Sequence, residues 1–439
     1  MTDSAQSEVD NATSTLPSSI SARLGRLQFH LSGKFRVLQC ADVQDVAHIS
    51  KDTISLISAA CDAVRPDIVI FTGNQIAGYE KDFSRTFRRR NVQKENGSSE
   101  ITYSINSKDK ENLISQVKSH ISRMVEPLEK RNIPWVVTYG NHDFQCGLSN
   151  AELDGLYQEF SCCMNKSTVH KESFGTVQCV NSILPKQLAV PCEPGTFALP
   201  VMDVQQERNV FSLVLVDSGD YAIEGGYGSP SKKALNFLEK LPTLVNSPLC
   251  VFQHFPLPQY YDLMREVPKE FAAQEHAIEG YRKFSEHYYA LDESKVLPDG
   301  YLGEGISCPD EDSGEFDILS NSETFAVIAG HDHRNAFAGK VSKDGILFVA
   351  TATCGFGSYG PEPAKRGVRL LEFDIRHPFE PRTQMLEFGD LVGKSSSKKP
   401  YTYGLTAESE HELPEVDLLR KPSLLARIVH HWRNKSSRY

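Results

Sequence analysis

The stretch Ile68-Val69-Ile70-Phe71-Thr72-Gly73-Asn74 joins a continuous apolar run to a polar turn that contains glycine. An apolar run of this length without alternation is typical of a parallel strand that is buried on both faces. Upstream, residues 35–40 form another short apolar run, and residues 51–64 carry apolar side chains at helical spacing. The order of strand, helix and strand predicts a βαβ unit at the start of an α/β domain.

Further apolar runs follow along the chain, and each predicts a strand: residues 135–139, 211–216, 249–253, 325–329, 346–350 and 368–373. Apolar residues at helical spacing between residues 114 and 128 predict a second helix. Helices alternate with strands in the early part of the chain, whereas the later part contains mostly strands. This order predicts an α/β domain with two packed sheets.

Residues 34–393 are predicted to form one large domain between two polar ends. Residues 1–33 have little apolar periodicity and are predicted to be a disordered lead. Within the domain, residues 81–112 are predicted to be an inserted loop. Residues 260–322 form a connection so long that a lid or an inserted subdomain is expected there.

Residues 394–439 are predicted to be a polar tail with a short basic amphipathic helix. Ser423 is a suitable N-cap, and apolar residues recur on one helix face after it: Leu424, Leu425, Ile428, Val429 and Trp432. Docking of this helix onto the protein's own core is one interpretation. The other is a weak contact with a membrane surface or a protein through residues 423–435.

The charge balance argues against a nucleic-acid partner. The 439 residues include 47 Lys and Arg against 57 Asp and Glu, a formal net charge of -10, whereas nucleic-acid binders are usually basic. Residues 1–17 lack the basic and apolar regions of a secretory signal. The ten cysteines contain no CxxC pair, so no thiolate zinc site is indicated, and reduced thiols predict a cytoplasmic protein.

Five short polar segments stand directly after predicted strands, where open α/β sheets place their ligands. They are Asp42-Val43-Gln44, Gly73-Asn74, Gly140-Asn141-His142-Asp143, His254 and Gly330-His331-Asp332-His333. Each segment alone is weak evidence, because a Gly-Asn pair is commonly a turn and a lone histidine is commonly a polar surface residue. Together their imidazole, carboxylate and amide groups suit Mn, Fe or Zn, and predict a site for one or two divalent cations.

With these segments, the chain resembles the calcineurin-like metallophosphoesterase superfamily. The usual order there is Asp-x-His, Gly-Asp, Gly-Asn-His-(Asp/Glu), a lone His and Gly-His-x-His, and the order here matches over residues 35–335. Other segments are similar to those of the purple-acid-phosphatase-like branch: Arg65-Pro66-Asp67, Asp217-Ser218-Gly219-Asp220-Tyr221, Gln253-His254-Phe255-Pro256-Leu257-Pro258 and Gly355-Phe356-Gly357-Ser358-Tyr359-Gly360. The resemblance implies a four-layer α-β-β-α sandwich of two mixed sheets, and hydrolysis of a phosphate ester by metal-activated water.

The resemblance also implies roles for individual residues. It assigns the first cation to Asp42 and His333, and the second to Asn141, His254 and His331. His142 would protonate the leaving alkoxide. Arg334 follows the His-x-His pair and is a candidate contact for the phosphate, with a surface charge as the alternative.

The chain departs from the family pattern at two positions. Gln44 replaces a histidine, and Asn74 replaces the aspartate that bridges the two cations. Both are expected to keep an oxygen donor as candidate ligands. Loss of the bridging charge removes about 4 kcal/mol of attraction at 4 Å and an effective dielectric constant near 20. Asp45 would compensate only if its loop turned toward the site.

Three interpretations of the departures stay open: a weakly dinuclear enzyme, a mononuclear enzyme, or a catalytically weakened homologue that binds a phosphate or a partner. Hydrolysis of a phosphomonoester, with phosphoproteins as one substrate class, is the predicted function, and a phosphodiesterase is the alternative. Asp217 and Asp220 follow a strand near these segments, and a simple turn is the preferred interpretation of their spacing.

Overall fold

Two large β-sheets organise the computed structural model, which describes residues 19–45, 49–88, 105–165, 174–179, 183–222, 225–343 and 345–393. The first contains β1 (Lys34–Cys40), β2 (Ile68–Thr72), β3 (Trp135–Thr138), β15 (Gly367–Asp374) and β16 (Arg382–Glu387). The second contains β4 (Val177–Gln178), β5 (Leu188–Glu193), β6 (Thr196–Met202), β7 (Asn209–Val216), β8 (Leu249–Gln253), β12 (Thr324–Ala329), β13 (Phe337–Lys340) and β14 (Leu347–Ala350).

Both sheets are mixed. The five-stranded sheet has the order β16-β15-β1-β2-β3, in which β1, β2 and β3 are parallel while β15 and β16 join in antiparallel fashion. The eight-stranded sheet has the order β13-β14-β12-β8-β7-β6-β5-β4, with β7, β8, β12 and β14 parallel. The carboxyl ends of the central parallel strands are therefore free to carry loops that form a site.

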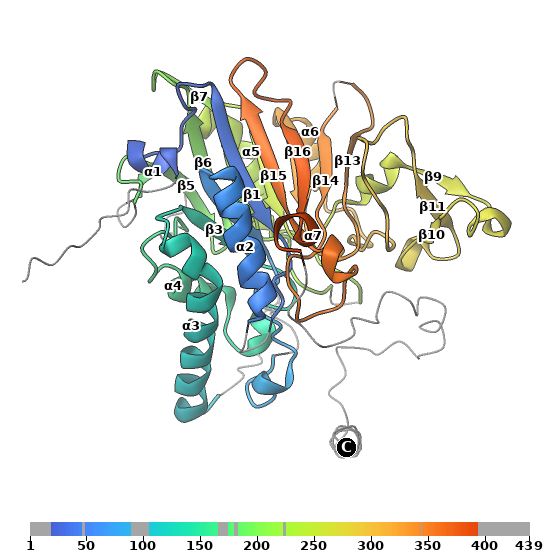
Figure 1. The fold of residues 1–439 in the computed structure, drawn as a ribbon, viewed down its shortest axis with the longest axis horizontal. Coiled ribbons are helices and arrows are strands. Elements are labelled where there is room, and N and C mark those ends of the chain that lie inside the picture. The colour runs from blue at the N-terminus through green and yellow to red at the C-terminus, as the bar shows by residue number, and fades with distance from the viewer. Residues whose placement is uncertain are drawn as a thin grey trace, which may run out of the picture.

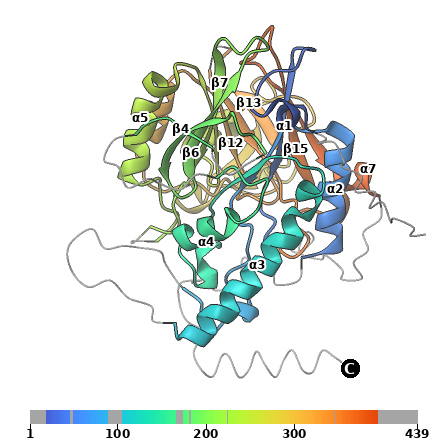
Figure 2. The ribbon, with the colours of Figure 1, turned by 90° about the vertical axis from the view of Figure 1, so that its left-hand side faces the viewer.

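Helices cover the outer face of each sheet. On the five-stranded sheet lie α2 (Lys51–Val64), α3 (Ser107–Glu129), α4 (Asn150–Tyr157) and α7 (Phe388–Leu391). On the eight-stranded sheet lie α5 (Lys232–Val245) and α6 (Glu315–Ser320). Figure 2 shows α5 and α2 on opposite flanks of the strands.

The apolar core forms three layers, as a four-layer sandwich requires. Alternation along β2 shows why: Ile68 and Ile70 lie in the layer between the two sheets, whereas Val69 and Phe71 lie in the layer under α2 and α3. A third layer lies between the eight-stranded sheet and α5 with α6. The predicted α-β-β-α sandwich of two mixed sheets is confirmed.

A small lobe is inserted after β8. It contains β9 (Met264–Val267), β10 (Ile278–Glu279) and β11 (Tyr288–Leu291), which form a sheet of their own, and it extends to one side of the main sheets (Figure 1). Bridges from Val296 to Gly339 and from Tyr301 to Ala336 join the following chain to β13. The part of segment 260–322 from β9 to β11 thus forms a lobe of its own, whereas α6 near its end packs on the eight-stranded sheet. The use of the segment as a lid stays a prediction.

The disordered lead expected through residue 33 is wrong for residues 19–33. Helix α1 (Ile20–Leu24) begins this segment, and Leu27 and Phe29 are buried in the layer between the sheets. The anchors are distant in sequence: Phe29 N–H donates to the Met202 carbonyl at 2.9 Å, and His30 contacts Asp67 at 2.8 Å. The apolar periodicity of a segment carries no sign of contacts with residues that are distant in sequence.

The inserted loop expected at 81–112 is also too long. Helix α3 begins at Ser107 with Asn106 as its N-cap, and its first two turns are polar and mostly exposed, so they lack an apolar period. Residues 89–104, the lead before residue 19 and the tail 394–439 with its expected helix lie outside the described residues. In the part of the chain that is described, no helix combines the length and apolar character that a membrane crossing needs.

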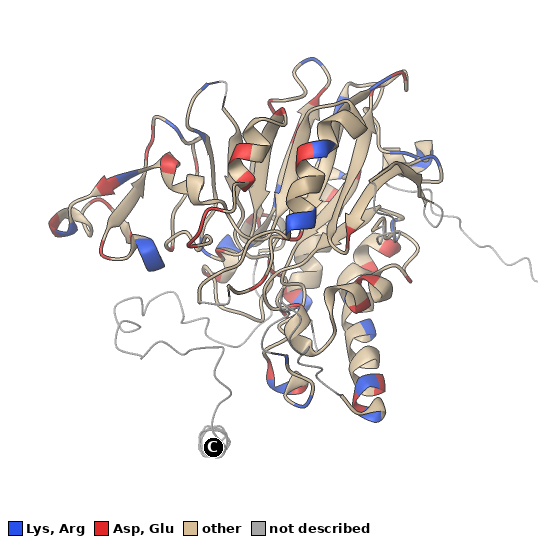
Figure 3. Cartoon of the chain, turned by 180° about the vertical axis from the view of Figure 1, so that it is seen from behind, with Lys and Arg blue, Asp and Glu red and all other residues tan. Residues whose placement is uncertain are grey.

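Charges of both signs are interspersed on α3 and on the inserted lobe (Figure 3). All ten cysteines are buried and free.

Candidate metal centre

The five polar segments predicted from the sequence meet at the carboxyl ends of β1, β2, β3, β8 and β12. Hydrogen bonds within and between the sheets hold these ends together just below the site. Gln39 Nε2 donates to Thr72 Oγ1 at 3.0 Å and to the Ala329 carbonyl at 3.3 Å, and His254 Nδ1 lies 2.9 Å from the Thr72 carbonyl. Loops from both sheets are therefore fixed relative to each other.

The loops turn back sharply to present their side chains. Asp42, Gln44, Asn74 and His331 all adopt left-handed backbone conformations, with φ of 50°, 38°, 53° and 71°. Such conformations are uncommon outside glycine and cluster at functional sites. Asp143 ties the second and third loops by accepting hydrogen bonds from three backbone N–H groups: Asn74 (2.8 Å), Gly140 (2.8 Å) and Ile76 (3.0 Å). Burial nevertheless raises the pKa of Asp143 to about 7.

One part of the site, here the histidine half, consists of Asn141, His254 and His331. The Thr72 carbonyl can only accept, so the proton of His254 lies on Nδ1 and its Nε2 carries a lone pair. This Nε2 lies 3.1 Å from Asn141 Oδ1 and 3.2 Å from His331 Nδ1. Burial lowers the pKa of both histidines. Two ligand atoms about 2.1 Å from a cation and at right angles are about 3 Å apart, so the spacing fits a cation.

The other part, the carboxylate half, consists of Asp42, His333 and Gln44. His333 donates from Nδ1 to the Tyr359 carbonyl at 2.7 Å, and its Nε2 lies 3.4 Å from Asp42 Oδ1. Burial alone would raise the pKa of Asp42, but His254, His333 and the His331 N–H together lower it. Gln44 donates from Nε2 to the Tyr79 hydroxyl at 3.2 Å, while its Oε1 is buried and has no hydrogen-bond partner.

Asp45 does not compensate for Gln44. Its carboxylate accepts hydrogen bonds from Ser50 N–H at 3.0 Å and Thr53 Oγ1 at 2.8 Å, at the start of α2 and away from the site. Burial raises the pKa of Asp45 to about 6.

Asn74 lies between the two halves, but its orientation corrects the expected oxygen donor. His142 N–H donates to Asn74 Oδ1 at 2.9 Å. The amide nitrogen therefore faces the site and donates to Asp42 Oδ1 at 3.2 Å and to Asn141 Oδ1 at 3.1 Å. An N–H group cannot bind a cation, so Asn74 in this orientation is not a ligand.

The donor sets of the two halves differ in how well they fit a cation. Among the described residues, no three His, Cys, Asp or Glu side chains gather in a metal-binding arrangement, because Gln44 and Asn74 stand where a histidine and a carboxylate would complete it. The histidine half still offers two imidazoles and the Asn141 oxygen, which fit one divalent cation. In the carboxylate half only Asp42 and His333 are strong ligands.

His142 lies beside the histidine half with its ring held on two sides. Its Nδ1 lies 2.8 Å from Gln145 Oε1, an acceptor, so the proton is held at Nδ1. Nε2, which lies 3.4 Å from Asn141 Nδ2, is the ring nitrogen left for proton exchange. The Tyr79 ring packs edge-on against it at 4.6 Å between centroids. Burial lowers the pKa of His142 to about 4.

Residues 35–335 match the family model described as calcineurin-like phosphoesterase. The chain belongs to this family. The match covers the five polar segments that follow strands, and the resemblance is confirmed.

Relatives of this family member carry contrasting names. "Probable inactive purple acid phosphatase 28" of Arabidopsis thaliana is 23% identical over 79% of this chain and 77% of its own. "Phosphatase DCR2" of Saccharomyces cerevisiae is 21% identical over 71% of this chain and 46% of its own. A solved dimetal phosphatase from Danio rerio is 11% identical, with a TM-score of 0.39 over 81% of this chain and 99% of its own.

Arg334, the candidate phosphate contact, packs on the Tyr359 ring, which in turn stacks on His333 of the metal centre. Its guanidinium carbon lies 5.4 Å from the centroid of the Tyr359 ring, and that ring stacks on His333 at 4.1 Å. Its backbone N–H donates to Glu304 Oε1 at 2.9 Å. Phosphate binding by Arg334 stays a prediction.

Three half-exposed tyrosines surround the centre, and no sequence motif pointed to them as a group. Tyr79 packs on His142, Tyr359 stacks on His333, and Tyr281 approaches Tyr227, whose ring lies 4.5 Å from that of His331. Among the tyrosines that the structure describes, these are the exposed ones. Tyr359 lies within the Gly355–Gly360 segment of the family resemblance, whereas Tyr79 and Tyr281 belong to no motif.

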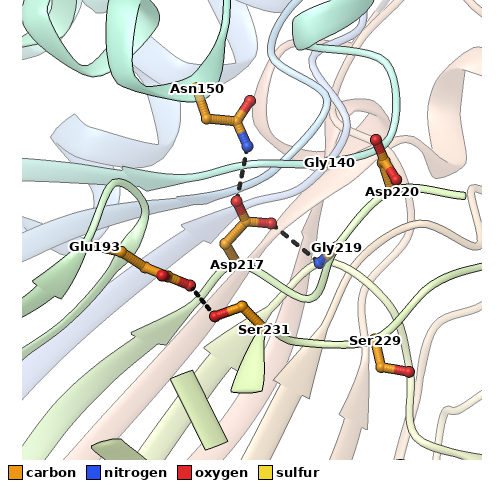
Figure 4. Close-up of a pocket in the computed structure, with 8 residues that line it drawn as sticks. All are labelled: Gly140, Asn150, Glu193, Asp217, Gly219, Asp220, Ser229 and Ser231. Carbon is orange, nitrogen blue, oxygen red and sulfur yellow. Dashed lines mark hydrogen bonds between the residues drawn. The ribbon is translucent and has the colours of Figure 1, made fainter. Parts of the chain in front are cut away.

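A cavity of about 170 Å³ borders the metal centre at Gly140 (Figure 4). Asp217 accepts from Gly219 N–H at 3.0 Å and from Asn150 Nδ2 at 2.7 Å, so the predicted turn is present. The Glu193, Asp217 and Asp220 carboxyl groups line the cavity. Burial raises the pKa of Asp217 to about 7. Carboxylates repel phosphate, so this cavity suits a phosphate group poorly.

Proposed function

We propose that this family member is a divalent-metal-dependent hydrolase of phosphate monoesters, with phosphoproteins as one substrate class. The observation that carries the proposal is the histidine half, where buried electron-pair donors of Asn141, His254 and His331 face one another at 3.1–3.2 Å. A cation placed between them would accept an electron pair from each of the three. Mn, Fe and Zn suit this donor set.

When bound, a divalent cation supplies Lewis acidity toward a phosphoryl oxygen. The chain's own contribution is His142 as general acid. Gln145 orients its ring, Tyr79 packs against it, and Nε2 is the atom from which a proton would pass to the leaving oxygen. The negative charge of a bound phosphate favours the protonated imidazole and so opposes the effect of burial on its pKa.

A catalytically weakened, phosphate-binding homologue is the second candidate function. The orientation of Asn74 supports it, and so do the relatives that are named probable inactive phosphatases. A cytoplasmic location is part of the proposal, since free cysteines are typical of reducing compartments. A phosphate ester is the proposed partner, and no nucleic acid is expected.

Turnover of p-nitrophenyl phosphate and of bis(p-nitrophenyl) phosphate, each with added Mn²⁺, tests the proposal. Release of nitrophenol from the monoester supports it, and preference for the diester favours a phosphodiesterase. The variant His142→Ala, purified in the same way, controls for contaminating phosphatases. Binding of inorganic phosphate without hydrolysis of either ester would establish the weakened homologue instead.

A further inference from the structure

The orientation of the Asn74 amide is fixed by its surroundings. The backbone N–H of His142 is an obligate donor, so it requires Oδ1 at 2.9 Å and not the amide nitrogen. Gly140 packs closely against Asn74 Oδ1, with no space for a Cβ at this position. The side chain is also buried, with 1% of its surface exposed. Turning the amide over would set its NH2 group against the His142 N–H and leave that N–H without an acceptor, so the hydrogen bond fixes the orientation.

Both hydrogens of this amide are used within the site. One is donated to Asp42 in the carboxylate half at 3.2 Å and the other to Asn141 in the histidine half at 3.1 Å. In the family pattern, an aspartate at this position offers an anionic oxygen to two cations. Here the same place holds an NH2 group whose hydrogens carry partial positive charge; they join the two halves by hydrogen bonds and repel cations.

With asparagine in place of aspartate at position 74, the two halves of the site differ in how well they can bind a cation. The histidine half keeps three electron-pair donors, and His331 Nε2 is buried without a partner. In the carboxylate half, both oxygens of Asp42 already accept hydrogen bonds, Oδ1 from Asn74 and Oδ2 from His331 N–H at 2.8 Å. Without the first-motif histidine, only His333 and the weaker amide oxygen of Gln44 are available there to share a cation with Asp42.

We infer that the chain binds a single divalent cation in the histidine half, and that the Asn74 amide excludes a second one. The hydrogen-bonded clamp replaces the bridging carboxylate and joins Asp42 to the histidine half without a second metal. Binding is measured without substrate, so the inference does not depend on hydrolysis.

The test is the number of Mn²⁺ ions bound per chain, measured by equilibrium dialysis with elemental analysis and by electron paramagnetic resonance. The full-length protein should bind one ion and give the spectrum of isolated Mn²⁺. Asn74→Asp should bind a second ion and give an exchange-coupled spectrum. Asn106→Asp makes the same chemical change at the exposed N-cap of α3, where aspartate also caps well, and should leave the count at one.

Two variants locate the ion without altering Asn74. His331→Ala should lose it, and His333→Ala should retain it. Two ions in the unaltered protein, no ion at all, or loss of the ion only in His333→Ala would each overturn the inference. A folded Asn74→Asp protein, checked by its thermal melting, that still binds one ion would disprove exclusion by the amide.

Discussion

Two buried polar clusters in this protein differ in how their lone pairs are satisfied. Asp67 is fully buried and accepts from Ser21 N–H and Oγ, His30 Nε2 and Arg36 N–H, at distances between 2.8 and 3.2 Å. Both oxygens of the carboxylate thus meet donors. The cluster is complete without any ligand, and it fixes the segment of residues 19–33 to the start of β2.

At the metal centre, several electron-pair donors face one another or lack a hydrogen-bond partner. His254 Nε2 faces Asn141 Oδ1, and Gln44 Oε1 and His331 Nε2 are buried without a hydrogen-bond partner. Buried polar groups are normally paired, so an unpaired set marks a place where something else binds. Burial and charge look alike in the two clusters. Complementarity of donors and acceptors is what separates a structural cluster from a ligand site.

The largest expected effect is on stability. Asp67→Ala leaves His30 and the donors of Ser21 and Arg36 unpaired, and should cost about 3–5 kcal/mol in the free energy of unfolding, measured by urea denaturation. Asp62→Ala, which removes an exposed ion pair with Arg131, is the matched control and should cost about 1 kcal/mol or less. Equal losses in the two variants would show that the cluster at Asp67 is not structural.

The second-largest effect is expected on the rate of phosphate-ester hydrolysis. His142→Ala should reduce turnover of an aryl phosphate by about 10²-fold or more, while Mn²⁺ content stays normal, because the general acid is lost and the histidine half is intact. His287→Ala, at an exposed histidine in the inserted lobe, should have no effect. Parallel loss of metal and activity would make His142 a ligand or a fold residue.

Substitution of a metal-binding residue should remove the stability that the bound metal ion contributes. His254→Ala should abolish stabilisation by Mn²⁺, which for the unaltered protein is about 2.7 kcal/mol at 100 times the dissociation constant. Thermal melting with and without Mn²⁺ measures the difference. If Mn²⁺ raised the melting temperature of His254→Ala as much as that of the unaltered protein, the cation would bind elsewhere.

The smallest effect is expected at Arg334. Arg334→Gln should raise KM for a phosphate monoester by about fivefold or less with kcat unchanged, because a partly exposed ion pair contributes at most about 1 kcal/mol. The increase should fade at high salt. Unchanged KM at low salt would assign Arg334 to the surface alone.

Much of the fold could be predicted because its central elements are locally encoded. The apolar runs at Ile68–Thr72 and Leu249–Gln253 and the helical period at Lys51–Val64 give these elements their observed bounds. Strands β5 and β6 were missed, and each contains a proline, Pro191 and Pro200. The residues 19–33 were missed because a distant carboxylate holds them in place.

The candidate site likewise has a part that could be predicted from the sequence and a part that could not. Motif order identified the residues that meet at the strand ends, since each stands directly after a strand. The direction of the Asn74 amide could not be predicted, because it depends on a backbone N–H of residue 142 that the fold brings close. The tyrosines around the centre come from three separate loops, and only their packing reveals them.

The Asn74 amide also bears on how readily this site can change by mutation. Codons for asparagine and aspartate differ by a single base, as do those for glutamine and histidine. A point mutation at codon 74 would therefore turn the hydrogen-bonded clamp into a carboxylate, and one at codon 44 would return an imidazole. Laboratory evolution that selects for phosphatase activity has a short path to the two-cation arrangement, and codon 74 is where the first change is expected.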